Sequence, residues 1–166
     1  MFKTAQPKIS AMDKAMKILA VSPVSEAELR KKLLRAGYPE ILVEPAVNEC
    51  IRRGYINDSL LATDCAEYLT VRGTGRRMVK MKLLRRGIDR ETVDAAIAGT
   101  DPEAELDAAR AALDCKLRLL SGEKQWRKKR EKAFRFMVSR GYTSDVISAV
   151  FSEINWKEPE DESEVC

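Results

Sequence analysis

The side chains in this sequence that could act on another molecule are lysines and arginines gathered in two short stretches. Residues 72–90 contain eight basic residues against the single acid Asp89, and residues 124–135 contain seven against Glu131. Between them, residues 91–114 contain seven acids against Arg110. Charge separated in this way indicates a polyanionic partner or one of mixed charge, although each run could equally be a solvated helix face.

Ten basic residues are therefore candidates for contact with a partner, because their charge suits DNA phosphates or acidic patches on a protein. Arg76, Lys80 and Arg85 would fall on one broad face of a helix, whereas the consecutive run near residue 129 would spread around its helix. Trp126, beside that run, could stack on a base or pack within the protein, and packing is the commoner role. The candidates are Arg72, Arg76, Arg77, Lys80, Lys82, Arg85, Arg86, Lys128, Lys129 and Arg130.

Groups that would support catalysis are missing from the sequence. It contains no histidine, which is the commonest general base and metal ligand. Gly73 and Gly75 lack the preceding strand that a dinucleotide-binding loop requires. Asp101 and Glu103 suit the first turn of a helix better than a pair of catalytic carboxylates. We therefore predict no enzymatic activity, no metal ion and no cofactor.

The cysteines indicate a reducing compartment. No two of them form a CxxC pair, so a zinc site is not expected, and there is no signal peptide to indicate an oxidising environment. The longest apolar run is far shorter than the roughly 20 residues of a membrane span. These features predict a cytoplasmic protein with reduced thiols at Cys50, Cys65, Cys115 and Cys166.

All of the elements that carry these residues are expected to be helices. The composition is 45% hydrophobic, 34% charged and 6% aromatic, which suits long helices better than a β-sandwich. Ser25 and Glu28 form a capping box, and Gly37, Gly87 and Gly141 are helix stops. Nine helices are predicted, at about residues 11–21, 26–36, 39–53, 57–71, 76–86, 89–97, 102–120, 123–140 and 144–154.

An internal repeat organises these helices. Gly37, Gly87 and Gly141 align at spacings of 50 and 54 residues, and apolar residues occupy the same four positions around each of them. Each repeat would contain a helix that ends in a left-handed glycine and a second helix that folds back on it. The aligned residues are Leu33, Leu83 and Met137 (four before), Leu34, Leu84 and Val138 (three before), Val43, Val93 and Ile147 (six after), and Val47, Ile97 and Phe151 (ten after).

With the helix that precedes each hairpin, the nine helices become three tandem three-helix repeats. We expect an all-α fold in which the repeats stack into an elongated, curved array, because each repeat alone would have a thin core. Tyr38, Tyr55 and Tyr142 follow helix-ending glycines and are expected to pack between repeats. The predicted segments are an N-terminal tail at 1–11, repeats at 12–54, 55–99 and 100–154, and an acidic disordered tail at 155–166.

Four motifs, in order along the chain, resemble those of the RecX family. They are SEAELRKKLLRAGY from Ser25, GYIND from Gly54, GTGRRMVKMKLLRRGID from Gly73 and RGYTSDVISAVF from Arg140. The resemblance covers most of the chain, from about residue 12 to residue 154. No single motif is specific, but the ordered set is.

The chain departs from the family pattern in its central repeat. Leu60 and Leu61 stand where the family usually has an aromatic residue and an arginine. Arg76 ends a turn that is usually Gly-Tyr-Gly-Pro, and Lys82 replaces a usual glutamate. The central repeat is therefore more basic than is usual in the family.

The resemblance implies a function as well as a fold. It implies that the protein binds in the groove of the RecA–single-stranded-DNA filament and inhibits RecA recombinase and ATPase activity in recombinational DNA repair and the SOS response. Contact with DNA would occur through the filament, and a monomer without membrane association is the simplest expectation. The basic helices alone also fit a second function, sequence-nonspecific binding of nucleic acid. A helix-turn-helix reader of DNA is disfavoured, because the same turn occurs three times.

Overall fold

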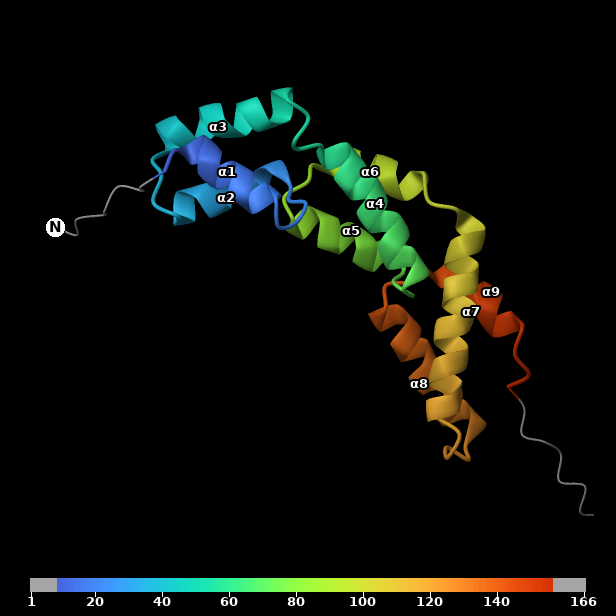
Figure 1. Ribbon diagram of the computed structural model, residues 1–166. Coiled ribbons are helices and arrows are strands. Elements are labelled where there is room, and N and C mark those ends of the chain that lie inside the picture. The colour runs from blue at the N-terminus through green and yellow to red at the C-terminus, as the bar shows by residue number, and fades with distance from the viewer. Residues whose placement is uncertain (1–8, 157–166) are drawn as a thin grey trace, which may run out of the picture. The chain divides into compact units, whose positions relative to one another are not determined.

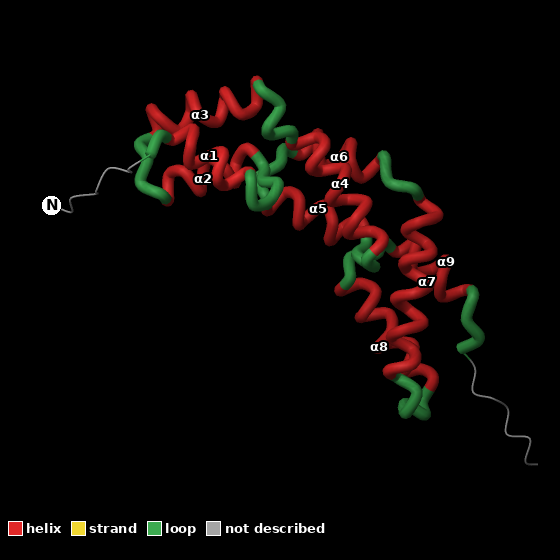
Figure 2. Tube along the Cα trace, viewed as in Figure 1, coloured by secondary structure: helices red, strands yellow, loops and turns green. Residues whose placement is uncertain are grey.

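The computed structural model describes residues 9–156, and every regular element in that range is a helix. Nine helices follow one another there (Figure 1), and Figure 2 shows that loops join them without any strand. The predicted all-α fold is confirmed. The predicted tails at 1–11 and 155–166 lie mostly outside the described residues. The helices are α1 (Ala11–Leu19), α2 (Glu26–Arg35), α3 (Glu40–Arg52), α4 (Asp58–Val71), α5 (Arg76–Arg85), α6 (Arg90–Ala98), α7 (Pro102–Leu119), α8 (Trp126–Ser139) and α9 (Ser144–Ser152).

The described chain divides into two compact units, which we consider separately. Unit 1 comprises residues 9–66 and 80–99, and unit 2 comprises residues 67–79 and 100–156. Helices α1, α2, α3 and α6 lie wholly in unit 1, and α7, α8 and α9 lie wholly in unit 2. The residues of the predicted middle repeat are shared between the two units.

Local chemistry places the helix ends where the sequence predicts them. At the start of α2, the Glu28 N–H donates to Ser25 Oγ at 3.1 Å, and the Ser25 N–H donates to Glu28 Oε2 at 3.0 Å, which is the reciprocal capping box. Gly37, Gly87 and Gly141 end their helices with φ angles of 90°, 81° and 87°. This left-handed conformation favours glycine, so the repeat alignment marks three equivalent turns.

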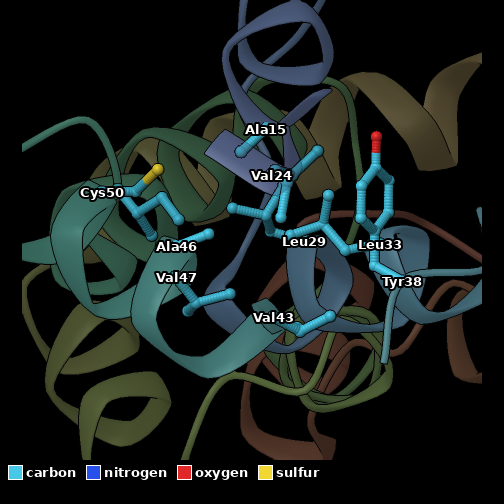
Figure 3. Close-up of a cluster of buried hydrophobic side chains, with 11 residues drawn as sticks. Ala15, Val24, Leu29, Leu33, Tyr38, Val43, Ala46, Val47 and Cys50 are labelled. Carbon is cyan, nitrogen blue, oxygen red and sulfur yellow. The ribbon is translucent and has the colours of Figure 1, made fainter. Parts of the chain in front are cut away.

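The core of unit 1 lies among α1, α2 and α3. Leu29 and Leu33 of α2 lie together with Val43 and Val47 of α3 in a cluster that Ala15 of α1 completes (Figure 3). All five side chains are fully buried. Burial of large aliphatic side chains contributes roughly 1.5–3 kcal/mol each relative to exposure, so this cluster is what holds the three helices together.

Helices α7, α8 and α9 enclose the core of unit 2. Leu113, Met137, Ile147 and Phe151 are buried in it. Trp156, which the sequence assigns to the disordered tail, instead packs on this core. Its ring centroid lies 4.8 Å from that of Phe151, and its indole Nε1 donates to the Phe151 carbonyl oxygen at 2.9 Å. The ordered chain therefore continues past α9.

The prediction that the residue three positions before each glycine belongs to the core is wrong. Leu34, Leu84 and Val138 remain 42%, 40% and 46% exposed. Consecutive helical residues are rotated by about 100°. The residue four positions before each glycine points into the hairpin and is buried. The next residue is rotated away from the hairpin and is therefore partly exposed.

The tyrosines that follow helix-ending glycines have different surroundings. Tyr38 is buried, and its hydroxyl donates to the Ile9 carbonyl oxygen at 2.9 Å. Tyr142 is buried without a hydrogen-bond partner for its hydroxyl among the described residues, and burial raises its pKa to about 12. Burial is thus confirmed for both, although Tyr38 packs in the cluster of α1, α2 and α3 and not between repeats. The expected packing is wrong for Tyr55, which is exposed because Ile56 takes the buried position instead.

This difference predicts opposite responses to the same substitution. Tyr38→Phe removes a hydrogen bond and should lower the free energy of unfolding by about 1 kcal/mol. Tyr142→Phe removes a buried hydroxyl that has no partner, so it should leave stability unchanged or raise it. Urea unfolding followed by circular dichroism measures both, and an equal loss for the two variants would contradict the assignment.

Candidate partner-binding site

Three of the ten predicted contact residues are engaged inside the protein, and the first is Arg76, at the start of α5 in unit 2. Its backbone N–H donates to Glu105 Oε1 at 3.1 Å. Its Nε lies 2.5 Å from Glu105 Oε2, as an ion pair whose N–H is not directed at that oxygen. The Glu105 side chain is only 3% exposed. The carboxylate therefore neutralises the guanidinium and also satisfies the positive end of α5.

Lys80, in the second turn of α5, is engaged within unit 1. Its ammonium forms an ion pair with Asp94 of α6. The Arg90 guanidinium also approaches this carboxylate, with Nε 3.8 Å from Oδ2. The Lys80 side chain thus joins α5 to α6, and its charge is already matched.

Arg86 is the third, and it is held by four groups of unit 1. Its Nε and Nη2 donate to the two carboxylate oxygens of Glu28 at 3.1 and 2.9 Å. Nη2 also donates to the Pro23 carbonyl oxygen at 3.0 Å, and Nη1 lies 3.1 Å from the Cys65 sulfur. The Arg86 carbonyl oxygen accepts from Ser25 Oγ at 2.5 Å. Arg86 is therefore a clamp between α5 and the start of α2.

The clamp also affects the ionisation of Glu28. Burial raises the pKa of this carboxyl, but the hydrogen bonds from Arg86 and from the Ser25 N–H outweigh burial, and the net pKa lies below the usual value of 4.5. The carboxylate form is therefore stabilised by folding.

The remaining candidates on α5 point to solvent. Arg77, Lys82 and Arg85 are exposed and form no ion pair with any described residue. Arg72, just after α4, is exposed but lies over the Tyr68 ring at 5.3 Å and donates to its hydroxyl at 2.9 Å. Of the six basic candidates from Arg76 to Arg86, therefore, only three keep a freely available positive charge.

The second predicted cluster lies at the start of α8 in unit 2. Lys128 is exposed and Lys129 is partly buried. The Arg130 guanidinium lies 5.8 Å from the Phe151 ring centroid. Trp126 is partly buried, with the Arg127 guanidinium 5.4 Å from its ring centroid. Arg130 is thus exposed beside a core ring, and the partial burial of Trp126 is the observation that favours the packing interpretation.

Unit 1 also has a hollow that the sequence analysis did not identify. It lies between α2 and the C-terminal end of α5, with a volume of about 400 Å³. Lys31, Lys32 and Arg35 of α2 line it together with Arg85 and Arg86. These α2 residues escaped notice because Glu26 and Glu28 are close to them in sequence, so the local net charge is small.

Comparison with known proteins matches the same elements. A model of the first three-helix domain of RecX matches residues 11–50, and a model of the third three-helix domain of RecX matches residues 103–151. The chain is 33% identical over 150 residues to the regulatory protein RecX of Deinococcus radiodurans, with 90% of this chain and 71% of that protein covered. The chain belongs to the RecX family. The regulatory protein RecX of Vibrio campbellii is 29% identical over 150 residues, covering 90% of this chain and 95% of that protein.

Solved RecX structures have the same fold. The crystal structure of RecX from Lactobacillus salivarius aligns with a TM-score of 0.78 at 19% identity, covering 86% of this chain and 93% of that chain. A second crystal structure of regulatory protein RecX also aligns at 0.78, with 20% identity, covering 86% of this chain and 70% of the other. The prediction of an all-α fold built of RecX three-helix domains is confirmed.

The departures of this RecX chain from the family pattern have structural consequences. Arg76 stands where the family turn usually has proline, and its backbone N–H makes the hydrogen bond to Glu105 that a proline could not make. Lys82, in place of a usual glutamate, is exposed and adds an unpaired positive charge to α5. One departure thus strengthens the fold, whereas the other changes the surface.

Metal sites, free thiols and membrane-spanning helices can be described for residues 9–156. No group of three or more His, Cys, Asp or Glu side chains in that range is arranged to hold a metal ion. Cys50, Cys65 and Cys115 are free thiols, and Cys166 lies outside the described residues. None of the helices in the range combines the length and apolar character that crossing a bilayer requires.

The Arg86 clamp predicts a pH-dependent loss of stability. Arg86→Lys keeps the charge but removes the planar fork, so it should lower the free energy of unfolding by about 1–2 kcal/mol at pH 7. Because the pKa of Glu28 is lowered in the folded protein, its contribution is fully present above pH 4.5 and is lost as the pH falls through the folded-state pKa. The gap between the two proteins should therefore narrow in acid.

Chemical denaturation at pH 7 and at pH 3 measures this gap. Arg90→Lys is the matched control, because the Arg90 side chain is 80% exposed and its Nε lies 3.8 Å from Asp94 Oδ2, which is too far for a direct hydrogen bond. A gap for Arg86→Lys that stays constant between the two pH values would show that the Glu28 pair does not stabilise the fold.

Proposed function

We propose that this RecX-family protein binds the RecA–single-stranded-DNA filament and inhibits RecA recombinase and ATPase activity, in recombinational DNA repair and the SOS response. It acts as a cytoplasmic monomer, without catalytic activity of its own. Membership of a family of regulatory proteins supports a regulatory role. Both the DNA backbone and acidic protein patches are suitable targets for the basic side chains described above.

The observation that carries the proposal is the division of the basic residues of α5 into two groups. Arg76 is bound to a buried acid, and Lys80 is bound to Asp94 of the same fold. Arg77, Lys82 and Arg85 are exposed without an internal acid among the described residues. Unmatched exposed cations contribute little to stability, so a partner anion can use their charge without competing with the fold. We therefore assign the filament contact of α5 to the exposed group.

The first test is DNA-dependent ATP hydrolysis by RecA on saturating single-stranded DNA. The unmodified protein should inhibit hydrolysis when it is well below one copy per RecA. Arg77→Glu/Lys82→Glu should need about tenfold more protein for the same inhibition, since each reversal replaces attraction by repulsion at an exposed contact. Lys17→Glu/Arg118→Glu changes the net charge equally at exposed sites outside both basic stretches and should inhibit normally.

Two outcomes would contradict the proposal. Absence of inhibition by the unmodified protein at one copy per RecA would remove RecA as the target. Equal losses in the two double variants would mean that net charge, rather than the α5 surface, governs inhibition.

The second candidate function is direct, sequence-nonspecific binding of nucleic acid by the same exposed cations. Its signature is salt dependence, because each phosphate contact releases a counterion and the slope of log K against log salt is about −0.7 per contact for single strands. A filament regulator should bind naked oligonucleotide weakly and inhibit RecA at salt concentrations where that binding is lost. Titration of a fluorescent oligonucleotide from 50 to about 300 mM salt, beside the ATPase assay, separates the two. Inhibition that disappears together with naked-DNA binding would favour direct nucleic-acid binding.

A further inference from the structure

The hollow between α2 and the C-terminal end of α5 is lined mainly by basic side chains. Its walls carry five basic side chains, Lys31, Lys32, Arg35, Arg85 and Arg86, and one acid, Glu28. At about 400 Å³, it lies in the size range of small-molecule sites. It lies entirely within unit 1, so its walls are placed by a single compact unit.

The acid in this hollow does not neutralise its cations. Both carboxylate oxygens of Glu28 accept hydrogen bonds from Arg86, at 3.1 and 2.9 Å, so this pair is internally balanced. Lys31, Lys32 and Arg35 are exposed and form no ion pair with the described residues. The five cations that line the hollow outnumber its single acid, so this concave site is strongly positive.

Arg30, on the same helix, differs from the cations of the hollow because acids pair with it. Arg30 donates to Glu26 at 2.8 Å and to Glu44 at 2.6 and 3.1 Å, so its charge is used within the fold. On the side of α2 that lines the hollow, Lys31 and Arg35 are four residues apart, and the one acid on this side, Glu28, is held by Arg86. Like charges at this spacing destabilise a helix slightly. The arrangement therefore costs stability in the free protein, and a bound anion would relieve that cost.

Favourable interaction of basic residues with helix C-termini does not account for the site. Lys32 and Arg35 in the last turn of α2, and Arg85 in that of α5, each complement their own helix dipole. That effect acts on each helix separately and does not require the residues to share a hollow. Lys31 lies before the last turn and lines the hollow as well.

We propose that this hollow binds the phosphate groups of nucleotides, either of a free nucleoside triphosphate or of a nucleic-acid strand. Phosphate carries several negative oxygens, which suits a site with two arginine forks and two lysines. A protein partner would need an apolar or aromatic anchor, and the apolar lining here is limited to Ala27 and Gly87. No aromatic ring lines the hollow, so bases do not stack in it, and binding is independent of base identity.

The test measures binding to the full-length chain without RecA, so its result does not depend on the proposed inhibition. Calorimetric titration with inorganic tripolyphosphate, ATP, CTP and a single-stranded oligonucleotide gives four affinities. Lys31→Gln/Lys32→Gln/Arg35→Gln should bind tripolyphosphate about tenfold more weakly or worse, since charge-assisted hydrogen bonds are lost. Lys17→Gln/Arg52→Gln/Arg118→Gln removes the same net charge from exposed sites outside the hollow and both basic stretches, and should weaken binding by no more than about twofold.

A second variant guards against a loss of fold. Arg85→Gln changes the opposite wall from α5 and should also weaken tripolyphosphate binding, while far-ultraviolet circular dichroism and the thermal midpoint stay unchanged. ATP and CTP should bind equally. If the triple variant lowers the affinity for ATP and CTP but not for the oligonucleotide, the ligand is a free nucleotide. If it lowers the affinity for the oligonucleotide equally, the ligand is the backbone of a nucleic-acid strand. Either result supports the site.

Three results would overturn it. The unmodified chain could fail to bind tripolyphosphate at millimolar concentration. The hollow variant and its control could lose affinity equally, which would show general attraction to a positive surface. Finally, poly-glutamate could bind as well as tripolyphosphate and respond in the same way to the hollow variants, which would assign the site to acidic protein segments instead.

Discussion

In each compact unit, a left-handed glycine at a helix end lies directly against the first turn of another helix. In unit 1, a Cβ added to Gly87 would lie 2.4 Å from the Cβ of Ala27. In unit 2, a Cβ added to Gly141 would lie 2.4 Å from the backbone nitrogen of Met78. Both positions require glycine twice over, because the φ angle is positive and because there is no room for a side chain. Gly37 has the same conformation but nothing within 4 Å, so its requirement is conformational alone.

The polar contacts beside the two close approaches are also equivalent. The carbonyl oxygen of Arg86 accepts from Ser25 Oγ at 2.5 Å, and that of Arg140 accepts from the Gly75 N–H at 2.9 Å. The guanidinium of Arg86 donates to the Pro23 carbonyl oxygen, two residues before Ser25. That of Arg140 approaches the carbonyl oxygen two residues before Gly75, at 3.5 Å. At these two docked helix ends an arginine precedes the glycine, but the Arg-Gly pair alone does not mark docking. Arg53 precedes Gly54, which has a positive φ angle and nothing within 4 Å of an added Cβ.

The helices and most of the core could be predicted from the sequence because they depend on local spacing. The capping box at Ser25 and the glycine stops act over three or four residues, and the aligned apolar positions follow from helical periodicity. The prediction that Leu34 is buried was wrong, because an apolar residue beside a buried one is not itself required to be buried. Sequence spacing alone does not distinguish a buried apolar residue from an exposed apolar neighbour.

The candidate site was harder to predict because its charges are matched over long distances. The acids that bind Arg76, Lys80 and Arg86 lie 29, 14 and 58 residues away in sequence. Local charge counts therefore overstated the available charge of α5. They understated that of α2, because Glu26 and Glu28 are taken up by Arg30 and Arg86. Only the fold separates the charges that hold helices together from those that remain free.

This separation has a consequence for how the protein can respond to a partner. Releasing Arg76 from Glu105 would leave a carboxylate that is only 3% exposed without its counter-charge, which is costly in a buried environment. An incoming anion therefore gains little by competing for the clamp residues. It gains more at the exposed cations of α2 and α5, whose charge is unmatched in the free protein. Because salt screens exposed charges far more than buried pairs, ionic strength should govern association while leaving the fold nearly unaffected.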